Sequence, residues 1–106
     1  MRKSKRKIIV GLFILIFMLG TVSAYAAVNT VTFKIVEGSN LMIGAGVTVY
    51  LDNRVVFSGT TNSQALVTFN LEQGKTYKIS IFAKGKNWGP YDQYVQPYTR
   101  EVHIDI

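Results

Sequence analysis

The sequence contains no cysteine, a single histidine and only two prolines among 106 residues. The absence of cysteine excludes disulfide bonds, cysteine-based metal sites and thiol chemistry. The six acidic residues are scattered and lack the spacing of a calcium-binding loop. Small domains often depend on disulfides, so this chain must depend on packing or on neighbouring molecules for its stability. The composition therefore predicts no cofactor and no bound metal.

A basic block followed by an apolar run stands at the N-terminus. Five of the first seven residues are Arg or Lys, and residues Ile8 to Leu19 are apolar apart from Gly11. Ala24 and Ala26 match the A-x-A pattern of a signal peptidase site. The pattern predicts a signal peptide over residues 1–26, with a hydrophobic signal helix and cleavage after Ala26. The remaining domain, residues 27–106, is then extracellular or displayed on the cell surface.

Two other interpretations of the N-terminal segment stay open. The first is an uncleaved membrane anchor that leaves the C-terminal domain outside, although a spanning helix needs about 20 apolar residues. The strongly apolar stretch here covers only Ile8 to Leu19. The second is a pilin-type leader, in which cleavage after Gly11 leaves Leu12 as the first residue. Contact with a membrane is expected only through an uncleaved N-terminal segment.

Net charge outside the N-terminal segment is close to zero. The chain has twelve basic and six acidic residues, and removing the five basic residues of the leader leaves seven against six. No basic cluster stands in residues 27–106, so we expect no binding to nucleic acid.

Apolar and polar residues alternate through residues 27–106 in short segments separated by turn residues. This period of two is typical of half-buried β-strands. Asp52 and Asn53 form a turn pair between two such segments. Short strands every 8 to 12 residues predict one all-β domain, a β-sandwich of seven strands. The residues expected to point into its core are Phe33, Val47, Val49, Leu51, Phe69, Leu71, Tyr77, Ile79, Ile81, Val102 and Ile104.

Two stretches, residues 44–51 and 58–71, resemble the carboxypeptidase-regulatory-like, or transthyretin-like, β-sandwich modules. Members of that family commonly carry T-D-x-x-G-x-x-x-F-x-L and then G-x-Y. The residues that match this pattern here are Thr61, Phe69, Leu71, Gly74 and Tyr77. Asn62 stands where the family has Asp, and Ala65 stands where it has Gly. The resemblance implies a Greek-key sandwich of the prealbumin-like, or Ig-like, type and leaves the function open.

The turn at Asn62 needs a residue that tolerates a positive φ, and Asn is suited to that conformation. An Asn side chain can also cap such a turn by accepting bonds from nearby main-chain N–H groups. We therefore expect Asn62 to carry both roles.

No pattern in the sequence indicates an enzyme. Related adhesin modules join a Lys to an Asn or Asp in an isopeptide bond, but Lys34 and Asp105 fall out of phase with the apolar residues of their strands. Both are expected to face solvent. A transthyretin-like hydrolase needs several histidines, and His103 stands alone. The sequence thus predicts a non-enzymatic protein.

The segment from Gly85 to Tyr98 holds the only Trp, both prolines and half of the six tyrosines. We expect an irregular loop here in which Trp88, Tyr91 and Tyr94 are candidates for binding a partner, because aromatic rings are favoured at interfaces. Tyr98 resembles a core position of the family. In the alternative interpretation the rings only cap a small core.

Two functions remain open at this point. One is a binding module that contacts an extracellular protein or a glycan. The other is a structural subunit that self-associates through its strand edges, with residues 27–36 as a segment that neighbouring copies could exchange.

Overall fold

The computed structural model describes residues 27–106, which fold into strands joined by short turns. The predicted signal helix and the cleavage site at Ala24 and Ala26 lie outside the described residues. Within the described range no helix is long and apolar enough to cross a membrane. The eight strands are β1 (Val28–Glu37), β2 (Asn40–Leu41), β3 (Gly46–Leu51), β4 (Arg54–Thr60), β5 (Leu66–Glu72), β6 (Thr76–Ala83), β7 (Lys86–Tyr94) and β8 (Glu101–Asp105).

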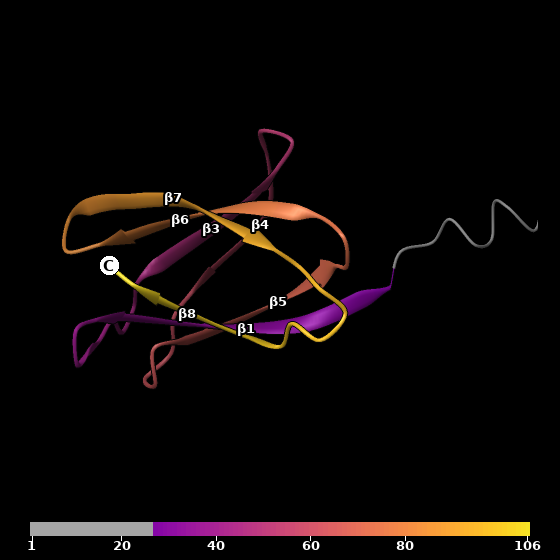
Figure 1. Cartoon of the computed structure of the whole chain (residues 1–106). Coiled ribbons are helices and arrows are strands. Elements are labelled where there is room, and N and C mark those ends of the chain that lie inside the picture. The colour runs from indigo at the N-terminus through magenta and orange to yellow at the C-terminus, as the bar shows by residue number, and fades with distance from the viewer. Residues whose placement is uncertain (1–26) are drawn as a thin grey trace, which may run out of the picture.

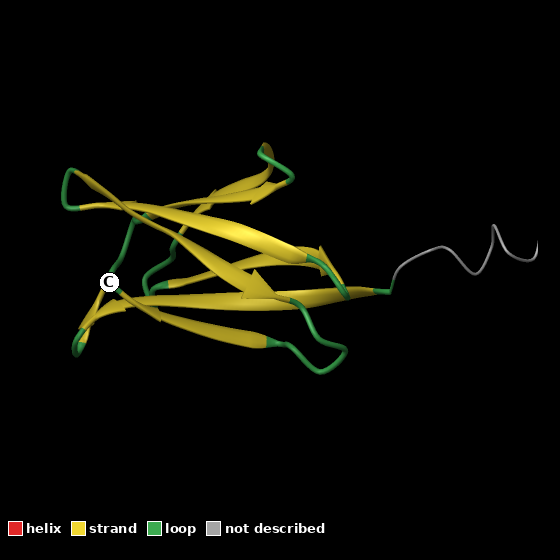
Figure 2. Cartoon of the chain, turned by 45° about the horizontal axis from the view of Figure 1, so that its top comes forward, coloured by secondary structure: helices red, strands yellow, loops and turns green. Residues whose placement is uncertain are grey.

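The strands form two sheets that lie one above the other (Figures 1 and 2). In the first sheet β1 is central, with β5 antiparallel on one side and β8 parallel on the other, while β2 pairs with the end of β1. The second sheet has the antiparallel order β4-β3-β6-β7. The predicted all-β class is confirmed. The structure has eight strands rather than seven, and β2 is only two residues long.

The core lies between the two sheets and follows the predicted alternation. Of the eleven residues expected to point inward, nine are buried, and Leu51 and Val102 are half-buried against the same cluster. Phe69 packs between Phe33 and Phe57, with ring centroids 5.9 and 5.7 Å away. Alternation predicts these positions because successive side chains of a strand point to opposite faces.

Two tight turns join the strands of the second sheet. Asp52 and Asn53, between β3 and β4, both have positive φ values of 52° and 63°. This is the conformation of a type I′ turn, whose twist matches that of the flanking strands. The predicted turn is confirmed. Lys84 and Gly85 form the equivalent turn between β6 and β7, with φ values of 56° and 70°.

The turn before β5 divides the two roles expected of Asn62 between two residues. Asn62 Oδ1 accepts hydrogen bonds from Gln64 N and Leu66 N at 2.8 and 3.1 Å, so the predicted cap is confirmed. The positive φ belongs to Ala65, at 62°, and its prediction for Asn62 is wrong. The residue that caps must stand at the start of the turn, whereas the reversal of φ occurs just before the chain enters β5. Ala65 is the position at which the resembling family carries Gly.

The aromatic segment is a strand, and the prediction of an irregular loop is wrong. Lys86–Tyr94 pairs with β6 along its length, and the register shifts between Ile79 and Ile81. Gly89, with a φ of 93°, and Pro90 form the bulge at that shift. Gly and Pro suggested a loop, but inside a strand they also mark bulges.

Candidate functional site

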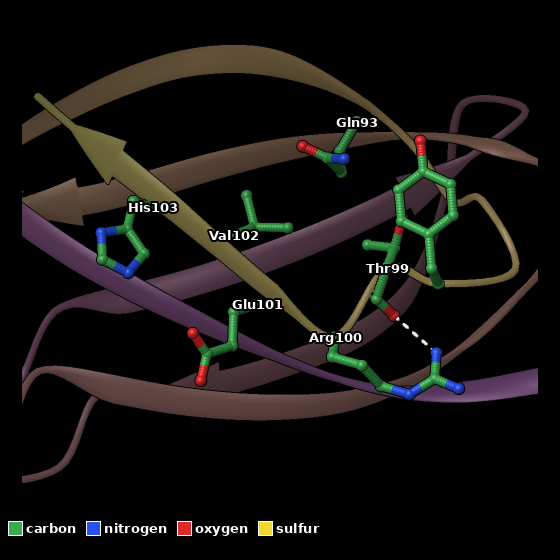
Figure 3. A pocket seen from close by; sticks show the side chains of 7 residues that line it. Gln93, Thr99, Arg100, Glu101, Val102 and His103 are labelled. Carbon is green, nitrogen blue, oxygen red and sulfur yellow. Dashed lines mark hydrogen bonds between the residues drawn. The ribbon is translucent and has the colours of Figure 1, made fainter.

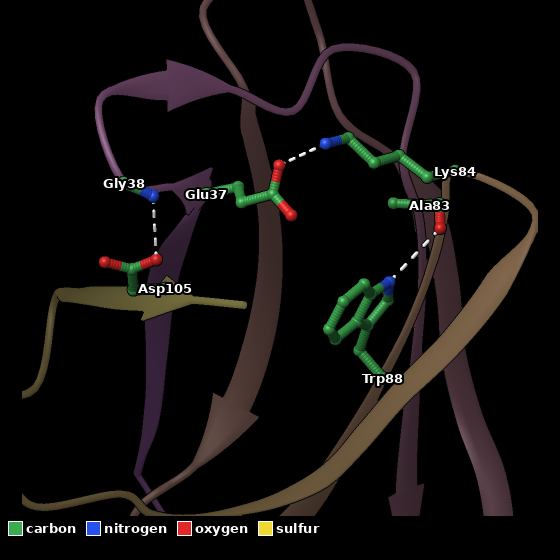
Figure 4. A network of polar contacts seen from close by, with 6 residues as sticks. All are labelled: Glu37, Gly38, Ala83, Lys84, Trp88 and Asp105. Carbon is green, nitrogen blue, oxygen red and sulfur yellow. Dashed lines mark hydrogen bonds and ion pairs between the residues drawn. The ribbon is translucent and has the colours of Figure 1, made fainter.

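The bulge decides where the aromatic side chains of β7 point. Trp88 stands opposite Ile81 and Tyr91 stands opposite Ile79, so both rings lie on the inner face although they are three residues apart. Both are half-buried against the core. Trp88 Nε1 donates a hydrogen bond to Ala83 O at 3.1 Å (Figure 4). These two binding candidates therefore help to cover the core.

Tyr94, the third candidate, is separated from the other two. Its side chain lies beyond the bulge, opposite the exposed Thr76, and is 50% exposed. Tyr98, in the turn that follows, is 74% exposed, so its prediction as a core residue is wrong. The three candidates thus do not form one aromatic binding surface.

A different site lies where β7 and β8 border the open side of the two sheets. A hollow of about 560 Å³ is lined by Gln93 from β7, by residues of β8 and by the turn that connects them (Figure 3). A second hollow of about 230 Å³ continues along the same two strands. We call these two hollows together the β7–β8 groove.

The groove has an apolar floor and polar rims. Its floor is formed by Ile79, Tyr91, Val102 and Ile104, which all belong to the core or pack against it. The rims carry Asp92 and Gln93 from β7, and exposed residues of β8. An apolar floor between polar rims can bury the side chains of a partner while its main chain stays hydrogen-bonded.

On the side of β8 that faces the groove, the main-chain groups pair with no other described strand. At its two ends, Thr32 N donates to Arg100 O at 2.9 Å and Ile106 N donates to Val36 O at 2.8 Å. Even-numbered residues therefore bond to β1. Successive residues of a strand direct their main-chain groups to opposite sides, so Glu101, His103 and Asp105 direct theirs away from β1. This edge is regular over five residues.

The edge of β7 is less suited to accept another strand. Its ladder is interrupted by the bulge, and Pro90 has no N–H to donate. Bulges and prolines are devices that protect sheet edges from pairing with other chains. Of the two strands that border the groove, β8 therefore has the more regular edge.

A buried side chain fixes the turn at the end of the groove. Asn29 is 3% exposed, and its Nδ2 lies 2.9 Å from Gln96 O and 3.1 Å from Thr99 O. Asn29 Oδ1 accepts a hydrogen bond from Gln73 Nε2 at 2.7 Å. These hydrogen bonds from β1, the central strand of the first sheet, therefore hold the turn between β7 and β8 in place.

Lys34, His103 and Asp105 lie on the outer face of the first sheet. Lys34 stands opposite His103, and Asp105 is exposed with its Oδ1 accepting a bond from Gly38 N at 2.9 Å (Figure 4). The prediction that Lys34 and Asp105 face away from the core is confirmed. Glu37, at the end of β1, forms an ion pair with Lys84 at the tip of the other sheet.

Strand β1 occupies the centre of its own sheet. Its residues pair with β5 from Val28 to Lys34 and with β8 from Thr32 to Val36. The segment considered for exchange between copies is thus an ordinary first strand of this fold.

A second surface lies on the outer face of the other sheet. Two adjoining hollows, of about 340 and 250 Å³, share Tyr50, Asn53 and Lys78. Lys78 Nζ pairs with Asp92 Oδ1 at 2.9 Å, and Pro90 borders the smaller hollow. The face combines one aromatic ring with hydrogen-bonding groups. Among residues 27–106, no three His, Asp or Glu side chains gather closely enough to hold a metal ion.

No protein-family model matches this chain, and no curated protein is significantly similar to it in sequence. The resemblance to carboxypeptidase-regulatory-like modules therefore stays a prediction. The function has to be inferred from the surfaces themselves.

Sequence reasoning missed Asn29 and the β7–β8 groove. A signal for Asn29 was present, because it stands in phase with the inward residues Val31, Phe33 and Ile35, and a polar residue in that series is expected to have buried partners. The groove had no comparable signal. The groove exists because β7 and β8 are edge strands of their two sheets on the same side of the molecule, and the topology alone determines this.

Proposed function

We propose that this protein is a secreted or cell-surface, non-enzymatic module that holds an extracellular protein along the β7–β8 groove. We further propose that its sheets form a Greek-key sandwich of the prealbumin-like, or Ig-like, type. The predicted signal peptide over residues 1–26 supports an extracellular location. The partner adds an extended segment to β8 and covers the apolar floor.

One observation carries this proposal. The edge of β8 is regular and pairs with no other strand among residues 27–106, and it borders an apolar floor on which Val102 is still half-exposed. Edge strands beside apolar pockets recognise extended peptides, since the main chain supplies affinity and alternate side chains supply specificity. The other strand at the groove, β7, is blocked by its bulge.

Site-specific crosslinking tests the proposal. A photoreactive phenylalanine derivative replaces Tyr98, which is 74% exposed at the groove, or Val55, which is 58% exposed on the opposite edge at β4. On the cells that produce the protein, we expect position 98 to give one adduct with a single segment of another polypeptide, and position 55 to give none. Equal labelling from both positions, or none from position 98, would contradict the proposal.

A glycan is the second candidate partner, favoured by the hollows around Tyr50 on the outer face of the second sheet. Tyrosine rings stack on sugars, and Asn53 and Lys78 supply hydrogen bonds at the same place. A glycan array should then give signals that Tyr50→Ala abolishes and Tyr98→Ala retains. The opposite pattern would exclude this face.

A further inference from the structure

We infer that the segment that pairs with β8 belongs to a different protein and carries basic residues alternating with apolar ones, because the charges of β8 attract such a strand and repel a second copy of this chain. This inference rests on the proposed function. It concerns the chemistry of the partner at the same groove.

The outward row of β8 sets the charge of the partner. Glu101 and His103 lie on one side of the strand and Val102 on the other (Figure 3). Asp105 alternates in phase with Glu101 and His103, and all three are exposed. A strand added at this edge places every second side chain directly beside that row. Opposite charges in such cross-strand pairs are favourable and like charges are unfavourable. A lysine or arginine of the added strand beside Glu101 or Asp105 therefore forms a favourable cross-strand pair.

The neighbouring groups leave this acidic character in place. Lys34, one strand further in, stands opposite His103 and lines a small hollow with Glu101, but among the described residues no ion pair joins it to Glu101 or Asp105. Asp105 accepts one hydrogen bond from Gly38 N, a main-chain group without net charge. The positive charge of Arg100 is directed back to its own turn, since Nη1 donates to Pro97 O and Thr99 O.

The inward-facing residues of β8 determine which side chains the partner needs at its remaining alternate positions. Val102 and Ile104 point to the floor between the sheets, where Tyr91 and Ile79 of the second sheet also lie. Side chains of the added strand that point the same way cover these residues and are removed from water. The partner therefore needs apolar residues at alternate positions.

The same charges act against a second copy. Antiparallel pairing of two β8 strands over their full length places Glu101 of each copy opposite Asp105 of the other. Two like-charged pairs then meet in one short ladder, which is unfavourable. Shifting the register removes these contacts but also shortens the ladder, which has only five residues. Repulsive elements of this kind give an edge its specificity.

Two short peptides test the chemistry of the partner. One is an acetylated and amidated nonapeptide that alternates Lys and Val, and the other has Glu in place of each Lys. We expect the Lys–Val peptide to bind residues 27–106 at least tenfold more tightly at low salt, and to protect the amides of Glu101, His103 and Asp105 from hydrogen exchange. In the double variant Glu101→Gln, Asp105→Asn, the ratio of the two affinities should fall to near one. Both peptides should still bind through their alternating apolar residues. Equal affinity of the two peptides for the unchanged protein, or protection at β4 instead, overturns the inference.

A charge reversal tests the exclusion of a second copy. Asp105→Lys turns each repulsive Glu101–Asp105 pair into an attractive one, so this variant should form dimers in sedimentation experiments at concentrations where the unchanged protein and Asp105→Asn stay monomeric. If Asp105→Asn dimerises as well, or if the unchanged protein dimerises through β8, the charges do not exclude self-pairing.

The crosslinking and peptide experiments distinguish failure of this inference from failure of the proposed function. A crosslink from position 98 without a preference for the Lys–Val peptide keeps the groove as the contact site and rejects only the basic, alternating partner sequence. A Lys–Val preference without that crosslink rejects the proposed function instead.

Discussion

Trp88 illustrates how one side chain of this protein serves the core and the strand edge together. Its ring packs against the buried cluster, and its indole N–H reaches Ala83 O, so no polar atom is left without a partner. Lys86 Nζ lies over the ring, 5.7 Å from its centre. The residue is therefore held by packing, by a hydrogen bond and by a cation.

Trp88→Ala should lower the free energy of unfolding by about 2 to 3 kcal/mol, somewhat below the cost of truncating a fully buried aromatic residue, because Trp88 is half-buried. Tyr94→Ala, on the same strand but 50% exposed, should change it by less than about 0.5 kcal/mol. Urea unfolding of the two variants measures the difference. If Trp88→Ala has the same free energy of unfolding as the unchanged protein, the ring does not stabilise the core, and Trp88 becomes a candidate binding residue again.

The bulge of β7 is the element that departs most from the regular pattern. By adding one residue to the strand, it turns both Trp88 and Tyr91 inward and interrupts the edge beside the groove. Gly89 makes this possible, since a Cβ at that position would lie 2.8 Å from Ile79 O and the φ is 93°. One glycine thus affects both the packing of β7 and the regularity of its edge beside the groove.

Gly89→Ala should destabilise the domain by at least about 2 kcal/mol, because it combines a positive φ with a clash against main chain. Gly46→Ala is the matched control in the same sheet. Its Cβ would meet Phe82 only at 3.7 Å, in ordinary contact, so its cost should stay below about 1 kcal/mol. Thermal melting compares the two, and equal melting temperatures would show that the bulge accommodates a side chain.

The sequence predicts most of the strands because their signal is local. Alternation in β1, β3, β5, β6 and β8 identified the inward residues, and the pair Asp52-Asn53 identified the hairpin turn. In β7 the bulge changes the phase between Trp88 and Tyr91, so no single alternation runs through the strand. The groove depends on the parallel pairing of β8 with β1, which joins residues as far apart as Thr32 and Glu101. No local pattern encodes that contact.

At the scale of the whole molecule, the hydrogen bonding beside the first sheet reaches the residue predicted to follow the signal peptide. Gln73 N donates a hydrogen bond to Ala27 O at 2.8 Å, next to Val28 and Glu72, the first pair of the β1–β5 ladder. Cleavage after Ala26 leaves every described strand complete.

N-terminal sequencing of the protein recovered outside the cell should therefore give Ala27 as its first residue. Detection of an intact Met1 in the membrane fraction would favour the uncleaved anchor. A first residue at Leu12 would favour the pilin-type leader.

The pairing of the first described strand with the last also has a consequence for the time at which the protein folds. The central β1 lacks one neighbour until β8 is available, so the first sheet is completed only after β8 has been released. Contacts between such distant segments make folding slow, because the ordering of a long loop precedes the gain from pairing. We expect a nascent chain with this topology to leave its first sheet incomplete until β8 emerges, which suits the predicted export of an incompletely folded chain.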